Sequence, residues 1–169
     1  MGKQVCSQYS GSCCPSRSGG VVFRGVAQLS LDSKGRFAVP SRFREALTER
    51  CNGQVVVTAD SDRCLLIYPL PEWEPIEQKV MSLSSFNAQI RELQRRLVGY
   101  AEDAVMDTTG RILVPPALRQ FAQLEKSVVL VGQGNKFELW NKDNWEQLMD
   151  RGGGFASGGL PPELEGFSL

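Results

Sequence analysis

The stretch Leu31-Asp32-Ser33-Lys34-Gly35-Arg36 recurs 75 positions later as Met106-Asp107-Thr108-Thr109-Gly110-Arg111. Both copies read apolar-Asp-x-x-Gly-Arg. Each copy is followed by a Val-Pro pair and a further arginine, Val39-Pro40 with Arg44 and Val114-Pro115 with Arg119. Six identities fall within thirteen aligned positions, and the apolar pattern between them is kept. The chain therefore contains an internal duplication.

Each copy has the residues of a tight turn between two strands. Asp stands first and Gly last in Asp32-Ser33-Lys34-Gly35, an order that suits a type I turn because Asp bonds the following backbone and Gly accepts a positive φ. Apolar residues alternate with polar ones over 27–31 before the turn and continue at Phe37 and Val39. The pattern predicts a β-hairpin that carries Asp and Arg at its tip, and the second copy repeats it around 104–114.

The residues after each hairpin predict a helix, a second hairpin and another helix. Pro40 and Pro115 suit a helix start, and apolar residues then fall three to four apart over 41–47 and 116–122. Apolar strand pairs follow, separated by turn-rich segments, and each copy closes with a helix that contains a tryptophan (strands 55–58 with 64–68 and 128–131 with 137–140; helices at Trp73 and Trp145). The tryptophans are expected to fill the core. The fold class is α+β.

The predicted organisation has five parts. They are a disordered leader (1–21), a first repeat (22–86), a linking helix (87–101), a second repeat (102–150) and a Gly/Pro-rich tail (151–169). We expect that translation of the natural protein starts near Val21 or Val22. An intact mass that includes the leader would contradict this expectation.

The amino-acid composition excludes several classes of function. The 169 residues carry 19 basic and 19 acidic side chains, so the net charge is zero and only local fields can attract a ligand. The segment Arg24–Arg44 is one such field, with five basic side chains against one acidic. No membrane span or signal peptide is expected. The sequence predicts a cytoplasmic protein.

The catalytic inventory is poor. The chain contains no histidine, so Ser-His and Cys-His pairs are absent, and no phosphate-binding glycine loop occurs. Five cysteines lie without disulfide or zinc spacing, and Cys64 in an apolar strand is expected to be a buried hydrophobe. Asp32 and Asp107 could form a carboxylate pair, but each has a local arginine better suited to hold it. We expect no enzyme activity, catalytic residue, metal, cofactor or small-molecule substrate.

The Asp-x-x-x-Arg tips are the candidate functional residues. A carboxylate across a tight turn can fix the direction of a guanidinium, which can then contact phosphate or a guanine edge. The alternative is a surface ion pair that stabilises the turn by about 0–1 kcal/mol. Since Lys34 has Thr109 as its counterpart, the first tip should bind DNA more strongly. The candidate DNA-binding residues are Asp32, Lys34, Arg36, Asp107 and Arg111, with Arg24 as a further candidate.

The paired motif, together with Phe23-Arg24-Gly25, resembles the MraZ family of bacterial transcription regulators over about residues 22–150. That family is related to AbrB-type regulators. The resemblance implies that the two repeats form a pseudo-symmetric, AbrB-like swapped-hairpin β-barrel with flanking helices. It also implies a ring-shaped homo-oligomer that displays the tips.

In function, the resemblance implies binding to double-stranded DNA, at direct repeats upstream of the protein's own gene. That binding would regulate the division and cell-wall gene cluster, and it implies a nucleoid-associated protein. Two alternatives stay open: an antitoxin-like protein whose tail docks a partner, and a structural ring-forming protein that binds no nucleic acid.

Overall fold

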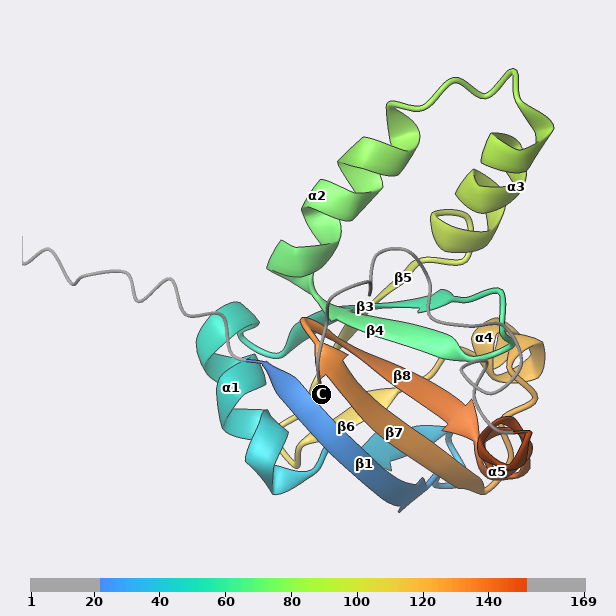
Figure 1. The fold of residues 1–169 in the computed structure, drawn as a ribbon. Helices are drawn as coiled ribbons and strands as arrows, with labels where there is room; N and C mark the ends of the chain where they lie inside the picture. The colour runs from blue at the N-terminus through green and yellow to red at the C-terminus, as the bar shows by residue number, and fades with distance from the viewer. Residues whose placement is uncertain (1–21, 152–169) are drawn as a thin grey trace, which may run out of the picture.

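The computed structural model describes residues 22–151 of the chain (Figure 1). Its strands are β1 (Phe23–Ser30), β2 (Arg36–Ala38), β3 (Gln54–Ala59), β4 (Leu65–Pro69), β5 (Glu102–Val105), β6 (Arg111–Leu113), β7 (Ser127–Gly134) and β8 (Lys136–Asn141). Its helices are α1 (Ser41–Cys51), α2 (Leu70–Met81), α3 (Ala88–Leu97), α4 (Pro116–Phe121) and α5 (Lys142–Asp150). The expected leader, and the expected tail beyond residue 151, lie outside the described residues.

The strands form one antiparallel sheet of six, in the order β1-β7-β8-β4-β3-β5, and a separate ribbon of β2 with β6. The predicted hairpins β3–β4 and β7–β8 are confirmed. Every other strand pairing joins the first repeat to the second, namely β1–β7, β2–β6, β3–β5 and β4–β8. The repeats are thus interleaved.

The prediction of a hairpin around each Asp-x-x-x-Arg tip is wrong beyond the turn itself. The turn closes, because the backbone N–H of Asp32 donates to the carbonyl of Arg36 at 2.8 Å. The two strands then separate, and β1 pairs with β7 while β2 pairs with β6. Separation lets β1 extend the large sheet while the buried Phe37 of β2 enters the core below it.

A closed β-barrel is also absent from the described residues. The six-stranded sheet ends at β1 and β5, each of which has one hydrogen-bonded neighbour. The β2–β6 ribbon joins neither edge through a strand ladder. The fold is therefore a mixed α+β structure with an open antiparallel sheet.

The core lies on both faces of the sheet, and both halves of the chain build it. The larger cluster fills the space between the sheet, the β2–β6 ribbon, α1 and α4, and it includes Phe37 and Leu47 of the first repeat with Ile112 and Leu130 of the second. The smaller cluster contains Trp73 and Trp140, which are 2% and 4% exposed. The expectation that these two tryptophans fill core is confirmed, whereas Trp145 is only partly buried.

Helices α2 and α3 lie side by side and project away from the sheet (Figure 1). The Gln94 amide of α3 donates to the carbonyls of Val80 and Leu83, each at 3.1 Å. The predicted helix 87–101 is too long. The N–H groups of Val98 and Gly99 both donate to the carbonyl of Gln94, which closes the last helical turn.

Cys51 and Cys64 are free thiols, and Cys64 is fully buried as expected. Burial raises the pKa of both thiols. None of the helices within residues 22–151 combines the length and the hydrophobicity that a membrane-spanning helix needs.

Candidate nucleic-acid interface

The first Asp-x-x-x-Arg turn is built around the carboxylate of Asp32. Its Oδ1 accepts hydrogen bonds from the backbone N–H groups of Lys34 and Arg36, both at 2.9 Å. The N–H of Gly35 donates to the carbonyl of Asp32 at 2.9 Å, which closes the turn. Gly35 has φ +82°, a backbone conformation that residues other than glycine rarely adopt. The turn therefore requires both its Asp and its Gly.

The second turn repeats this geometry and adds one hydrogen bond. Oδ1 of Asp107 accepts from the N–H groups of Thr109 and Arg111 at 2.9 Å. The Thr109 hydroxyl donates to the same oxygen at 2.6 Å. Thr109 was not among the predicted site residues. Its position as the counterpart of Lys34 is its only signal in the sequence, and that position does not reveal the hydroxyl contact.

The β2–β6 ribbon brings the two arginines onto one face. Arg36 lies opposite Leu113, and Ala38 lies opposite Arg111. Residues opposite one another in an antiparallel pair point to the same side. Phe37 and Ile112, which pair between them, point into the core instead. The ribbon thus separates a charged outer face from an apolar inner one.

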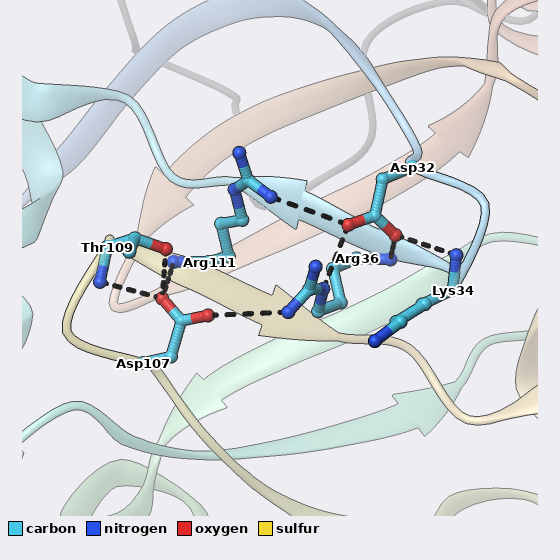
Figure 2. Close-up of polar contacts among 6 residues, drawn as sticks. All are labelled: Asp32, Lys34, Arg36, Asp107, Thr109 and Arg111. Atoms are coloured by element: carbon cyan, nitrogen blue, oxygen red, sulfur yellow. Dashed lines mark hydrogen bonds and ion pairs between the residues drawn. The ribbon is translucent and has the colours of Figure 1, made fainter.

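Figure 2 shows both guanidinium groups between the two turns, in a cluster of Asp32, Arg36, Asp107 and Arg111 that we call the Asp–Arg cluster. Nε of Arg36 donates to Oδ2 of Asp32 at 2.8 Å, and Nη1 of Arg36 lies 3.9 Å from Oδ2 of Asp107. Nη1 of Arg111 lies 3.6 Å from Oδ2 of Asp32. Each arginine therefore contacts the aspartate of the other repeat.

The expectation that each aspartate holds its own arginine is correct for only one turn. Asp32 pairs with Arg36 of the same turn. The Arg111 guanidinium instead pairs across the ribbon with Asp32, and its own aspartate binds Thr109. The Arg111 side chain is also more exposed than that of Arg36, at 45% against 31%.

Two predicted site residues lie outside the Asp–Arg cluster. The ammonium of Lys34 makes no ion pair within residues 22–151, and its side chain extends away from Asp32 (Figure 2). Arg24 is exposed at the far end of the edge strand β1, about 20 Å from Ser30 along the strand. The structure therefore does not place Arg24 beside the turns.

Hydrogen bonds lower the pKa of both aspartates. The backbone N–H and then the guanidinium of Arg36, helped by the N–H of Lys34, lower the pKa of Asp32 from its ordinary 3.8 to about 2. For Asp107 the Thr109 hydroxyl contributes most to the lowered pKa, followed by the N–H of Arg111. Both carboxylates are charged at neutral pH and can orient the arginines.

These shifts predict an acid-sensitive contribution to stability. Because the pKa of Asp32 is lower in the folded protein, its contribution is complete above pH 3.8 and is lost as pH falls towards about 2. We expect the difference in free energy of unfolding between the unsubstituted protein and Asp32→Asn to be constant from about pH 5 to 7. This difference should shrink as the pH falls from 3.8 towards about 2. Chemical unfolding at a series of pH values measures it. A difference that stays constant down to pH 2 would contradict the role of Asp32 in the turn.

Two further arginines complete the surroundings of the turns. The Arg119 guanidinium lies against Gly35, and the Arg44 guanidinium lies against Gly110. In the sequence, both stand out only as members of the repeat. Their recurrence at the same spacing was the signal that could have linked them to the site.

The amino-acid sequence that builds this site matches a known protein family. The family model described as "MraZ protein, putative antitoxin-like" matches residues 22–96 and 97–152. The chain belongs to the MraZ family. The MraZ relatives include proteins from Nitrosospira multiformis, Thiobacillus denitrificans and Nitrosomonas europaea, at 62%, 58% and 57% identity over 148 residues. Each alignment covers 88% of this chain and 100% of the relative, and each relative is named "Transcriptional regulator MraZ".

Proposed function

We propose that this chain is a sequence-specific DNA-binding transcriptional regulator that reads DNA with the Asp–Arg cluster. The name of its MraZ relatives describes a regulator of transcription rather than an enzyme. The observation that carries the proposal is the pair of arginines on the outer face of the β2–β6 ribbon, each oriented by a carboxylate. Guanidinium groups held in this way can donate two hydrogen bonds to a guanine edge or to a phosphate.

The cluster itself carries no excess charge, since two carboxylates balance two guanidiniums. Lys34 beside the first turn supplies an additional cation without an acidic partner in the described residues. Charge balance suits selective contact with bases more than strong general attraction to the phosphate backbone. Asp32, Lys34, Arg36, Asp107 and Arg111 are therefore the proposed DNA-contacting residues, and Arg24 would reach DNA only beyond the cluster.

A ring-shaped homo-oligomer fits a chain of zero net charge. One Asp–Arg cluster is a small surface, but several clusters on one duplex gain affinity through their effective concentration. The partner DNA would then carry direct repeats, one for each engaged subunit. We propose that these repeats lie upstream of the protein's own gene, and that binding there controls the division and cell-wall gene cluster from within the nucleoid.

The exchange of strands between the repeats also bears on the fold relationship. We propose that the crossing of β2 and β6, each held by the other repeat, is a single-chain form of the AbrB-type swapped hairpin. The open six-stranded sheet limits the comparison to these central strands.

Binding to the upstream DNA tests the proposed function. The full chain should bind this DNA more tightly than a shuffled sequence of the same length, and should lose affinity as salt rises from about 50 to 200 mM. A gel-shift titration at two salt concentrations measures both effects. Equal affinity for the two sequences would overturn sequence-specific binding. No affinity for either sequence would favour the alternative of a structural ring-forming protein that binds no nucleic acid.

The antitoxin-like alternative is kept because the matching family model carries that description. This alternative predicts a small protein partner that copurifies with the chain at a fixed ratio. Such a partner, together with the absence of DNA binding, would replace the proposed function.

A further inference from the structure

We propose that Arg44 and Arg119 are positioning residues for DNA recognition. Each holds the Asp-x-x-x-Arg turn of the opposite repeat in the orientation that presents the arginine of that turn. This inference rests on the DNA-binding function proposed above, and it assigns a role to two side chains that lie beside the Asp–Arg cluster but outside it.

The first turn is contacted by Arg119, which belongs to α4 of the second repeat. A Cβ added to Gly35 would lie 2.5 Å from Cζ of Arg119 and 2.6 Å from its Nη1. The guanidinium therefore fills the space that any other side chain would need at this position. Since Gly35 directly precedes Arg36, movement of the glycine backbone would move the base of the DNA-contacting side chain.

The second turn is contacted in the same way by Arg44, which belongs to α1 of the first repeat. A Cβ added to Gly110 would lie 2.7 Å from both Cδ and Cζ of Arg44. Arg44 and Arg119 are equivalent residues of the duplication, as are Gly35 and Gly110. The two contacts are thus one contact made twice, in reciprocal directions between the repeats.

Backbone hydrogen bonds hold the same glycines from the opposite repeat. The N–H of Val114 donates to the carbonyl of Gly35 at 3.0 Å, and the N–H of Val39 donates to the carbonyl of Gly110 at 2.8 Å. Each glycine is therefore fixed by a hydrogen bond and by a guanidinium from the other half of the chain. A turn held by the other repeat keeps its arginine at a constant position relative to the arginine of that repeat. Both arginines can then contact DNA at the same time without rearrangement of the turns.

The two arginines differ in one respect. Nε of Arg44 donates to the carbonyl of Val39 at 2.6 Å. Nε of Arg119 is buried and has no hydrogen-bond partner within residues 22–151. Replacement of Arg119 by lysine therefore removes the planar group that lies on Gly35 without breaking a hydrogen bond at Nε, so Arg119 is the better residue to test.

Direct contact with phosphate is the competing role for Arg119. The side chain lines an open cleft beside the first turn, but Asp32 and Glu125 line the same cleft together with Lys126. Two carboxylates disfavour a phosphate there. Lysine can replace arginine as a point charge at a phosphate but cannot replace its planar contact with a glycine.

The test compares Arg119→Lys with the unsubstituted full chain. We expect binding to the upstream DNA to weaken by about tenfold, because misplacing one base-reading arginine approaches the loss of its contact. Affinity for shuffled DNA and the salt dependence should stay unchanged, since no phosphate contact is lost. Arg42→Lys is the matched control: it makes the same change on α1, where the guanidinium lies over the ring of Phe43, 4.7 Å from its centroid. This control should bind normally.

A second measurement reports on position without DNA. The Nε–H of Arg36, which donates to Asp32, should shift in the NMR spectrum and exchange faster with water in Arg119→Lys than in the Arg42→Lys control. On DNA, adding Arg119→Lys to Arg36→Ala should cause no further loss, because the positioned side chain is already absent.

The outcomes separate this inference from the proposed function. If the unsubstituted chain fails to select the upstream DNA, the proposed function fails, and the Arg36 Nε–H signal still reports whether Arg119 positions the turn. Normal binding by Arg119→Lys with an unchanged Arg36 signal would overturn the inference. Normal binding by Arg119→Lys, together with a loss on both DNA sequences and a smaller salt dependence in Arg119→Ala, would also overturn it, in favour of direct phosphate contact.

Discussion

Replacing Arg36 with alanine is expected to weaken binding to the upstream DNA by at least about tenfold, and by more than Arg111→Ala. Arg36 contacts the carboxylates of both repeats, at 2.8 Å from Asp32 and 3.9 Å from Asp107. Its removal leaves the charge of Asp107 without a guanidinium partner among residues 22–151, although the carboxylate keeps its hydrogen bonds from Thr109 and Arg111. An unpaired negative charge would then lie on the proposed DNA-contacting face. Removal of Arg111 leaves Arg36 in contact with both aspartates. Gel-shift titrations of the two variants measure the difference.

The control for this pair is Arg95→Ala. Arg95 is an exposed arginine of α3, so its substitution removes the same formal charge away from the Asp–Arg cluster. It should leave the preference for upstream over shuffled DNA unchanged. Equal losses of DNA affinity in Arg36→Ala and Arg111→Ala would contradict the larger role of Arg36. A loss of affinity in Arg95→Ala as large as in Arg36→Ala would show that the Asp–Arg cluster has only a structural role.

Replacing Phe37 with alanine is expected to destabilise the fold by about 3–5 kcal/mol. Phe37 and Ile112 lie opposite each other in the β2–β6 ribbon, and each is only 1% exposed. Their side chains cover the core that both repeats build, so truncation of the aromatic ring would leave a cavity where the halves meet. The free energy of unfolding from a denaturant titration, at a fixed protein concentration, measures the loss.

Leu113→Ala is the matched control for the ribbon. Leu113 is the next residue of β6 and lies on the outer face, where it is 48% exposed. It should change the free energy of unfolding by no more than about 0.5 kcal/mol. Equal effects of the two substitutions would show that the ribbon does not seal the shared core.

The local structure of this chain could be predicted from its sequence because local chemistry determines it. The Asp and Gly of each turn, the prolines before α1 and α4, and the apolar runs of β3 and β7 act over a few residues. Strand partners do not depend on such short-range signals. The alternation in 27–31 fits pairing with β2 as well as with β7, and the choice depends on how the two halves bury Phe37 and Ile112 together.

The candidate site shows the same division. The aspartates and arginines could be selected from the repeated motif, and the turn geometry of Asp32 follows from its spacing to Lys34 and Arg36. The pairing of Arg111 with Asp32 of the other repeat could not be predicted from the sequence, because it depends on the register of β2 with β6.

The interleaved strand order has a thermodynamic consequence. Four strand pairings join the two repeats: β2–β6 and β4–β8 pair equivalent strands, and β1–β7 and β3–β5 are counterparts of each other. Residue pairs such as Phe37 with Ile112 therefore face each other as they would across the axis of a homodimer. Two separate subunits would meet only as often as their concentration allows. The covalent link between the repeats replaces that concentration with a fixed local one. Pairing within the chain is thereby independent of expression level, so dilution can take apart an assembly of whole chains but not the Asp–Arg cluster inside each one.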